Sequence, residues 1–124
     1  MKGNLNCPCG CGLTLKQPLI FFIDSIERDN GELTVTSGAR CDKYNAKIGA
    51  TKNSAHTLGL AVDVSTPDCL SRYKLAKSIL ARNCKRFGWS KEKKFIHFDI
   101  ATGGVPYPDE KTKEYGQFIA WDYS

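Results

Sequence analysis

The sequence predicts a small α+β domain, with helices packed on a short antiparallel sheet. The chain has 124 residues, 41% of them hydrophobic, which suffices for one core and therefore for one domain spanning residues 1–124. Two segments have the apolar spacing of helices, and three short segments alternate apolar and polar residues as strands do. Helices and short strands in this mixture are typical of the α+β class.

The first half of the chain is predicted to contain one helix and one strand. The helix spans residues 18–28, because Pro18 suits a first turn and the sequence Asp29-Asn30-Gly31 suits an end. The alternating segment ELTVT predicts a strand over residues 32–36. Residues 37–54 are predicted to form a loop. Spacing of i, i+3, i+4 and i+7 puts four apolar residues on one face of the helix: Leu19, Phe22, Ile23 and Ile26.

The second half is predicted to add a strand, a helix and a hairpin. A strand over residues 60–65 is followed by a helix capped at Thr66-Pro67-Asp68 and stopped by Gly88. The segment FIHFDI predicts a strand over residues 95–100, with a hairpin partner within residues 116–121. The residues of this helix that are predicted to face the core are Leu70, Tyr73, Ala76, Leu80 and Phe87.

Composition and charge limit the classes of partner. The net charge of +5 suits an acidic partner, but no predicted helix combines a basic face with base-reading residues, so nucleic-acid binding is not expected. The basic run KEKK at residues 91–94 is predicted to be a solvated hairpin loop. The longest apolar stretch, residues 19–23, is too short to span a membrane. We expect a monomer.

The N-terminal sequence MKGNLNCPCGCG lacks the apolar segment of a signal peptide. We therefore expect synthesis in the cytoplasm, followed by release or lysis if the protein acts outside the cell. Six cysteines are many for a cytoplasmic chain, and Cys7, Cys9 and Cys11 are clustered. Their C-x-C-x-C spacing differs from that of zinc ribbons. It favours a packed or disulfide-linked loop over a second, structural metal, and the cysteine pairing stays open.

Two predicted strands carry polar residues on one face. Alternation places Val62 and Val64 toward a core and Asp63 on the opposite face. In FIHFDI the same alternation places His97 and Asp99 together on one face. A buried carboxylate is costly unless it is paired or bound to a metal. With His56 from the preceding loop, two imidazoles and one carboxylate suit a zinc ion with an open fourth position, as in catalytic sites.

Each of these residues also has an ordinary structural interpretation. A single buried histidine is more often hydrogen-bonded in a core than bound to metal, and an aspartate in a strand often caps a turn. The grouping of both histidines of the chain with two acids makes the ordinary interpretation less common, and from the residues alone both interpretations stay open.

The segment SAHTLGLAVD matches the pattern S-x-H-x-x-G-x-A-x-D, with SGAR before it and FIHFD after it. Over residues 33–100 the chain thereby resembles the zinc D-alanyl-D-alanine carboxypeptidases and the phage L-alanyl-D-glutamate endolysins, a family with the hedgehog-type zinc peptidase fold. Its CPCGCG and SGARCDKYN segments are similar to those of short phage and prophage members.

The resemblance implies a zinc metallopeptidase, a hydrolase that cuts peptide bonds of the peptidoglycan stem during cell wall degradation. It implies one catalytic Zn²⁺ on His56, Asp63 and His97. Arg40 would contact a substrate carboxylate or carbonyl, since a guanidinium binds carboxylates in a bidentate way. Ser54 would lie beside the site, or would be a turn serine bonded to its own backbone.

One position departs from the family pattern. Many members have an acidic general base three residues before the last histidine, where this chain has Lys94. Asp99 has the right chemistry and strand parity to be the base, or to hold the ring of a ligand histidine, and Glu92 is a weaker candidate. The departure keeps a second hypothesis open, a catalytically inactive zinc-containing module that binds cell wall or protein.

Overall fold

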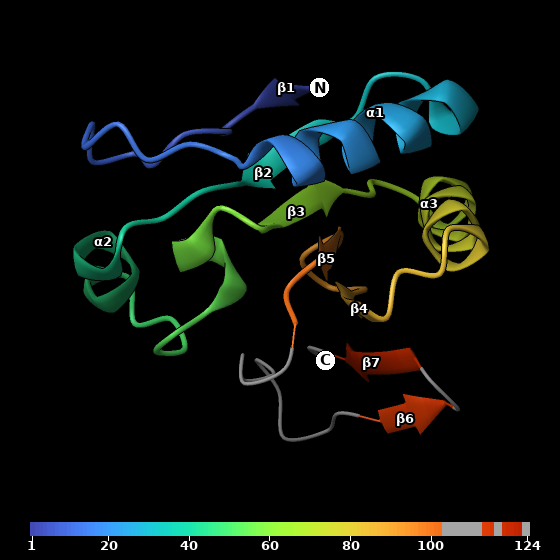
Figure 1. The fold of residues 1–124 in the computed structure, drawn as a ribbon. Coiled ribbons are helices and arrows are strands. Elements are labelled where there is room, and N and C mark those ends of the chain that lie inside the picture. Colours follow the sequence, from blue (N-terminus) through green and yellow to red (C-terminus); the bar gives the residue numbers. More distant parts are fainter. Residues whose placement is uncertain (103–112, 116–117, 123–124) are drawn as a thin grey trace.

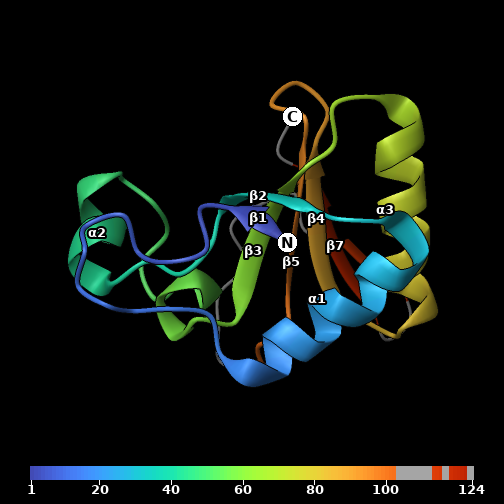
Figure 2. The ribbon, with the colours of Figure 1, turned by 90° about the horizontal axis from the view of Figure 1, so that it is seen from above.

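The computed structural model describes residues 1–102, 113–115 and 118–122. Its strands form one sheet in the order β1-β2-β3-β5-β4-β7-β6, with helices α1 and α3 on one side and α2 on the other (Figure 1 and Figure 2). The strands are β1 (Lys2–Gly3), β2 (Thr34–Ser37), β3 (Ala61–Ser65), β4 (Arg86–Ser90), β5 (Phe95–Asp99), β6 (Lys113–Tyr115) and β7 (Phe118–Asp122). The helices are α1 (Gln17–Asn30), α2 (Asp42–Lys47), the 3-10 turn η1 (Ala55–Leu58) and α3 (Cys69–Ala81).

The predicted α+β class is confirmed, but the sheet is mixed. Strands β2, β3, β5 and β4 pair antiparallel, whereas β1 pairs parallel with β2 and β7 pairs parallel with β4. The prediction that residues 116–121 contain the hairpin partner of β5 was wrong. The neighbours of β5 are β3 and β4, and β7 pairs antiparallel with β6. Residues 116–117 of the predicted partner lie outside the described residues.

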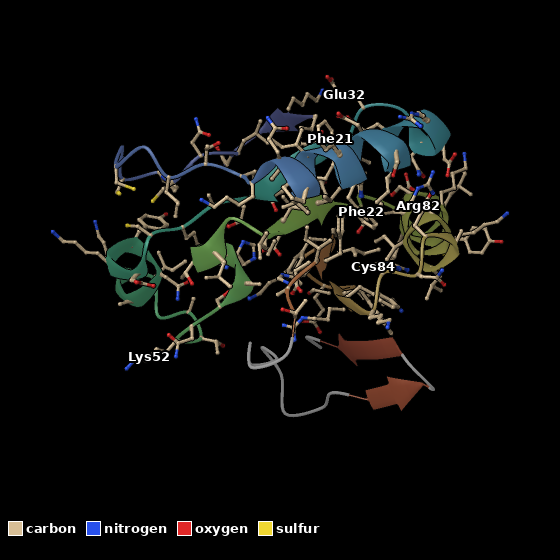
Figure 3. All side chains as sticks on the ribbon, in the orientation of Figure 1. Phe21, Phe22, Glu32, Lys52, Arg82 and Cys84 are labelled. Atoms are coloured by element: carbon tan, nitrogen blue, oxygen red, sulfur yellow. The ribbon has the colours of Figure 1, made fainter. Side chains whose placement is uncertain are left out.

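Helix α1 confirms the predicted apolar face. Leu19, Ile23 and Ile26 are fully buried, and the Phe22 ring packs against Phe98 of β5 with ring centroids 5.8 Å apart. Phe21 is exposed on the opposite face of the helix. Figure 3 shows Phe22 between α1 and the sheet. The helix therefore covers one face of the sheet through the side chains that its periodicity identifies.

The prediction for α3 was wrong at its start and on its buried face. The N-cap is Asp68, whose side chain accepts a hydrogen bond from the Ser71 amide at 2.7 Å in a reciprocal capping box. Leu75 and Ile79 are buried, whereas three residues predicted to face the core are exposed. These are Leu70, Tyr73 and Leu80, with exposed fractions of 60%, 61% and 43%.

The predicted end of α3 was also wrong. The helix ends at Ala81, and Asn83 takes a left-handed conformation with φ 56°, which asparagine tolerates better than most residues. Phe87 and Gly88, predicted as the last turn and the stop of the helix, belong to β4. The helix prediction missed this strand because it placed the stop at the glycine and not at the asparagine.

The predicted loop over residues 37–54 contains α2, which begins after Cys41. The turn η1 follows, capped by Ser54. No helix in the part of the chain that the structure describes is long and apolar enough to cross a membrane. The basic run over residues 91–94 forms an exposed turn between β4 and β5, as predicted.

The buried face of α3 can be tested with two leucines of the same helix. Leu75→Ala should lower the free energy of unfolding by about 2–5 kcal/mol, because it removes buried methylenes and leaves a cavity. Leu70→Ala should change it by no more than about 0.5 kcal/mol, because this side chain is largely exposed. Urea denaturation of both variants measures the difference. Equal losses in the two variants would contradict the assignment of the faces.

Candidate metal centre

The pairing of β3 with β5 brings two predicted site residues together. Asp63 lies directly opposite His97 in the antiparallel register. Side chains of directly opposed residues on one face of such a pair are in contact. The apolar neighbours Val62, Val64 and Phe98 point to the other face, into the main core. This alternation was predicted from the sequence, and the structure confirms it.

His56 reaches the same point from η1. This turn ends at Gly59, which has φ 69°, and a Cβ at this position would lie 2.7 Å from the Thr14 carbonyl oxygen. A side chain at Gly59 would be both strained and obstructed. The glycine therefore allows the chain to turn tightly from His56 into β3. The imidazole of His56, in the first half of this turn, is fully buried.

Three ligand-type atoms converge at this place. The Nε2 atom of His56 lies 3.2 Å from Nδ1 of His97 and 3.3 Å from Oδ1 of Asp63. The Nδ1 atom of His97 lies 2.9 Å from the same carboxylate oxygen. Two nitrogens and one oxygen at this separation can bind one metal ion, and His56, Asp63 and His97 form one of two such groups in the described residues.

The outer hydrogen bonds of the two histidines determine which nitrogens face the centre. The Nδ1 atom of His56 donates to the Gly38 carbonyl oxygen at 2.7 Å. The Nε2 atom of His97 donates to Oδ2 of Asp99 at 2.9 Å. A neutral imidazole carries one hydrogen, so when both rings are neutral their inner nitrogens present lone pairs. Two lone pairs and a carboxylate directed at one point repel one another unless a cation lies between them, and a metal ion fits this requirement.

The same contacts shift the pKa values of the three residues. Burial opposes protonation of His97, but its hydrogen bonds to Asp63 and Asp99 outweigh burial and raise its pKa to about 9. Burial lowers the pKa of His56 below its ordinary value. Burial opposes ionisation of Asp63, but the two histidines outweigh it and lower the pKa of its carboxyl. Without metal, a proton on His97 thus supplies the positive charge of the centre.

Asp99 lies behind His97 as seen from the converging atoms. Its Oδ1 accepts a hydrogen bond from Nε of Arg86 at 2.6 Å and one from the Ala101 amide at 3.1 Å. The carboxylate is buried, and Arg86 is its opposite neighbour on β4. Of the two roles predicted for Asp99, this arrangement favours holding the ring of His97 over acting as general base.

The converging atoms open into a pocket of about 390 Å³. Arg40 and Ser54, both predicted to lie at the site, line it, and Lys93 lines it as well. The Ser54 hydroxyl also accepts a hydrogen bond from the His56 amide at 3.3 Å, so this serine both lines the pocket and caps its own turn. Residues 48–51 form one wall of the pocket. Asp63 is the one carboxylate among the described residues that line this pocket.

The comparison with protein families identifies the group to which the chain belongs. A model of the family described as peptidase M15 matches residues 17–99, about two thirds of the chain. The chain belongs to the peptidase M15 family. No curated protein and no solved structure matches the chain. Membership confirms the resemblance found in the sequence and supports a hydrolase, a metallopeptidase of the peptidoglycan-peptidase kind.

Several residues of this M15 domain were missed by the sequence analysis. The Gly38 carbonyl that orients His56 is a backbone group and leaves no trace in the sequence. Arg86 was assigned to a helix, so its place opposite Asp99 was not visible. Phe95 and Lys93 line the pocket. Phe95 shares strand parity with His97, so the alternation of β5 could have identified it.

The raised pKa of His97 predicts how the metal-free protein responds to pH. The folded protein holds this proton more tightly than the unfolded chain, with a pKa of about 9 against the ordinary 6.5. The stabilisation is therefore complete below pH 6.5 and is lost as the pH rises through about 9. The loss is at most about 3–4 kcal/mol, at about 1.4 kcal/mol per pKa unit.

Urea denaturation of chelator-treated protein across this pH range measures the effect. His97→Gln is the control, because it removes the titrating group and keeps a polar side chain. Titrating groups outside the centre act equally in both proteins. Identical pH profiles for the parent and the variant would show that His97 carries no such proton.

The two roles of Asp99 are separated by Asp99→Asn. If Asp99 holds His97, the affinity of the centre for its metal ion should fall about 10- to 100-fold, and turnover at saturating metal should stay near that of the parent. If Asp99 is the general base, affinity should stay and turnover should fall roughly 100- to 10,000-fold. Metal titration measures the affinity, and steady-state kinetics at saturating metal measure the turnover. Glu92→Gln, in the exposed turn, tests the other candidate base in the same two measurements: turnover should fall if Glu92 carries the proton and should match the parent if it does not.

Proposed function

We propose that this M15 domain is a zinc peptidase that hydrolyses peptide bonds in the stem of bacterial peptidoglycan, as a D,D-carboxypeptidase or an endopeptidase. The observation that carries the proposal is the convergence of His56, Asp63 and His97 at a pocket that Arg40 and Lys93 also line. A group of metal-binding side chains beside two cationic side chains suits the cleavage of a substrate that carries carboxylates.

The donor set supports zinc as the metal. Two imidazole nitrogens and one carboxylate oxygen are ligands that zinc accepts, and three protein ligands leave a fourth position for water. A bound zinc ion would lower the pKa of this water toward about 7 and polarise the scissile carbonyl. The buried Asp99 and the Gly38 carbonyl support the choice, because each fixes the orientation of one histidine ring.

The charges of the pocket support an anionic substrate. Stem peptides of peptidoglycan carry free carboxylates, and the guanidinium of Arg40 can bind a carboxylate through two hydrogen bonds. Lys93 adds a second positive charge from the turn between β4 and β5. Arg40 and Ser54 would therefore orient the peptide beside the centre. With Asp99 holding His97, the proton would be carried by Glu92 or by a carboxylate of the substrate.

The similarity of the CPCGCG and SGARCDKYN segments to short phage and prophage members supports an endolysin-like role. In that role the protein would be made in the cytoplasm and would reach the wall on release or lysis. A second candidate function rests on Lys94, which stands where many members have an acidic base. It is a zinc-containing module that binds wall or protein without cleaving it.

Digestion of purified peptidoglycan by zinc-loaded protein tests the proposal. Mass spectrometry should detect cleaved stem peptides, and the masses identify the bond: loss of D-alanine indicates a D,D-carboxypeptidase, and a cut after L-alanine indicates an endopeptidase. His56→Ala should abolish the products. Arg40→Gln should lower kcat/KM roughly 10- to 100-fold, because it removes charge-assisted hydrogen bonds worth about 1.5–3 kcal/mol.

Pull-down on the same peptidoglycan separates the two candidate functions. The binding module is favoured if protein with zinc on His56, Asp63 and His97 is retained on the peptidoglycan but releases no cleaved peptides. If the protein is neither retained on peptidoglycan nor releases products from it, peptidoglycan is excluded as its substrate and as its binding partner.

A further inference from the structure

The second group of metal-type side chains consists of four cysteines. Cys7, Cys9 and Cys11 come from the N-terminal loop, and Cys41 is the N-cap of α2. All four sulfur atoms lie within 4.8 Å of one another. In Figure 3 yellow sulfur atoms gather where the N-terminal loop passes the start of α2. The family match begins at residue 17, so three of these cysteines lie outside it.

The sulfur separations suit a shared metal ion and do not correspond to disulfides. Cys7 Sγ lies 3.3 Å from Cys9 Sγ, which lies 3.5 Å from Cys41 Sγ. A disulfide requires about 2.05 Å. Four sulfurs bound tetrahedrally to zinc at about 2.3 Å lie roughly 3.8 Å apart. All six cysteines of the chain are free thiols in the structure.

The backbone around the cluster is already arranged for thiolates. The Cys41 amide donates to Cys7 Sγ at 3.3 Å, and the Tyr44 amide donates to Cys41 Sγ at 3.4 Å. Such N–H donors favour the charged form of a sulfur. Gly10 and Gly12 have φ 80° and 91°, a conformation that glycine adopts without strain. These two residues let the short loop turn its cysteines toward one point.

We propose that Cys7, Cys9, Cys11 and Cys41 bind a second, structural zinc ion. Four thiolate ligands close the coordination sphere, which is typical of structural zinc and leaves no position for a substrate. The ion would join the N-terminal loop to the start of α2, two segments that are far apart in the sequence.

This site would support the catalytic pocket through a four-residue segment. Cys41 follows Arg40, whose amide donates to the His56 carbonyl oxygen at 3.0 Å. Gly38, three residues before Cys41, accepts the hydrogen bond from the His56 ring. The Ala39 amide donates to the Leu5 carbonyl oxygen at 3.0 Å, so the N-terminal segment packs directly on this stretch. Fixing Cys41 thereby fixes the backbone that orients His56.

Metal analysis of variants tests the site independently of peptidase activity. The parent protein, purified under reducing conditions, should hold about two zinc ions per chain. His56→Ala/His97→Ala should keep about one, and its X-ray absorption spectrum should show only sulfur neighbours at about 2.3 Å. Cys9→Ser/Cys11→Ser should lose this ion. Cys69→Ser, an exposed cysteine outside the cluster, is the matched control and should keep both.

The histidine variant decides the question even if the cysteine variant does not fold. A folded His56→Ala/His97→Ala protein without zinc would overturn the proposal. Iron in place of zinc, or a disulfide among the four cysteines in freshly purified protein, would overturn it as well. Loss of peptidase activity with both zinc ions present would contradict the proposed function and leave the structural site intact.

Discussion

The register between β3 and β5 is the constraint on which the site depends. It places Asp63 opposite His97, and a slip by one residue would turn every side chain of the strand to the other face. The apolar residues of the same strands fix this register, because Val62 and Phe98 are fully buried in the main core. The energy that holds the polar face in place therefore comes from hydrophobic burial on the opposite face of the sheet.

Around this pair the chain satisfies each buried charge with a further partner. Asp63 of β3 and Asp99 of β5 hold His97, and Arg86 of β4 holds Asp99, so three adjacent strands contribute to the position of one ring. A buried carboxylate without such partners would be strongly unfavourable. The polar face thus extends across β3, β5 and β4 as a continuous network. Precise placement of one histidine is a property of the sheet and not of the motif alone.

The sequence revealed the parts of this arrangement that depend on local periodicity. The alternation in β3 and β5 identified Asp63, His97 and Asp99, and helical spacing identified the buried face of α1. Parts that depend on distant contacts were not accessible. The buried face of α3 follows from its docking on the sheet, where Leu75 and not Leu70 meets the core. Likewise, C-x-C-x-C spacing gave no reason to add Cys41, which only the folded chain brings to the N-terminal loop.

The position of the cysteine cluster agrees with the distribution of apolar contacts. Residues 40–54, all within the described part of the chain, contribute no side chain to either buried hydrophobic cluster. This segment nevertheless supplies Arg40, Ser54 and one wall of the pocket. Local hydrogen bonds, such as that from the Asn45 side chain to the Thr51 carbonyl oxygen, contribute only about 1 kcal/mol each. A segment with so little hydrophobic burial needs another source of order, and small domains commonly obtain it from a structural metal. The cluster includes Cys41, directly after Arg40 at the start of this segment, so a metal ion bound there would restrain the backbone that enters the pocket.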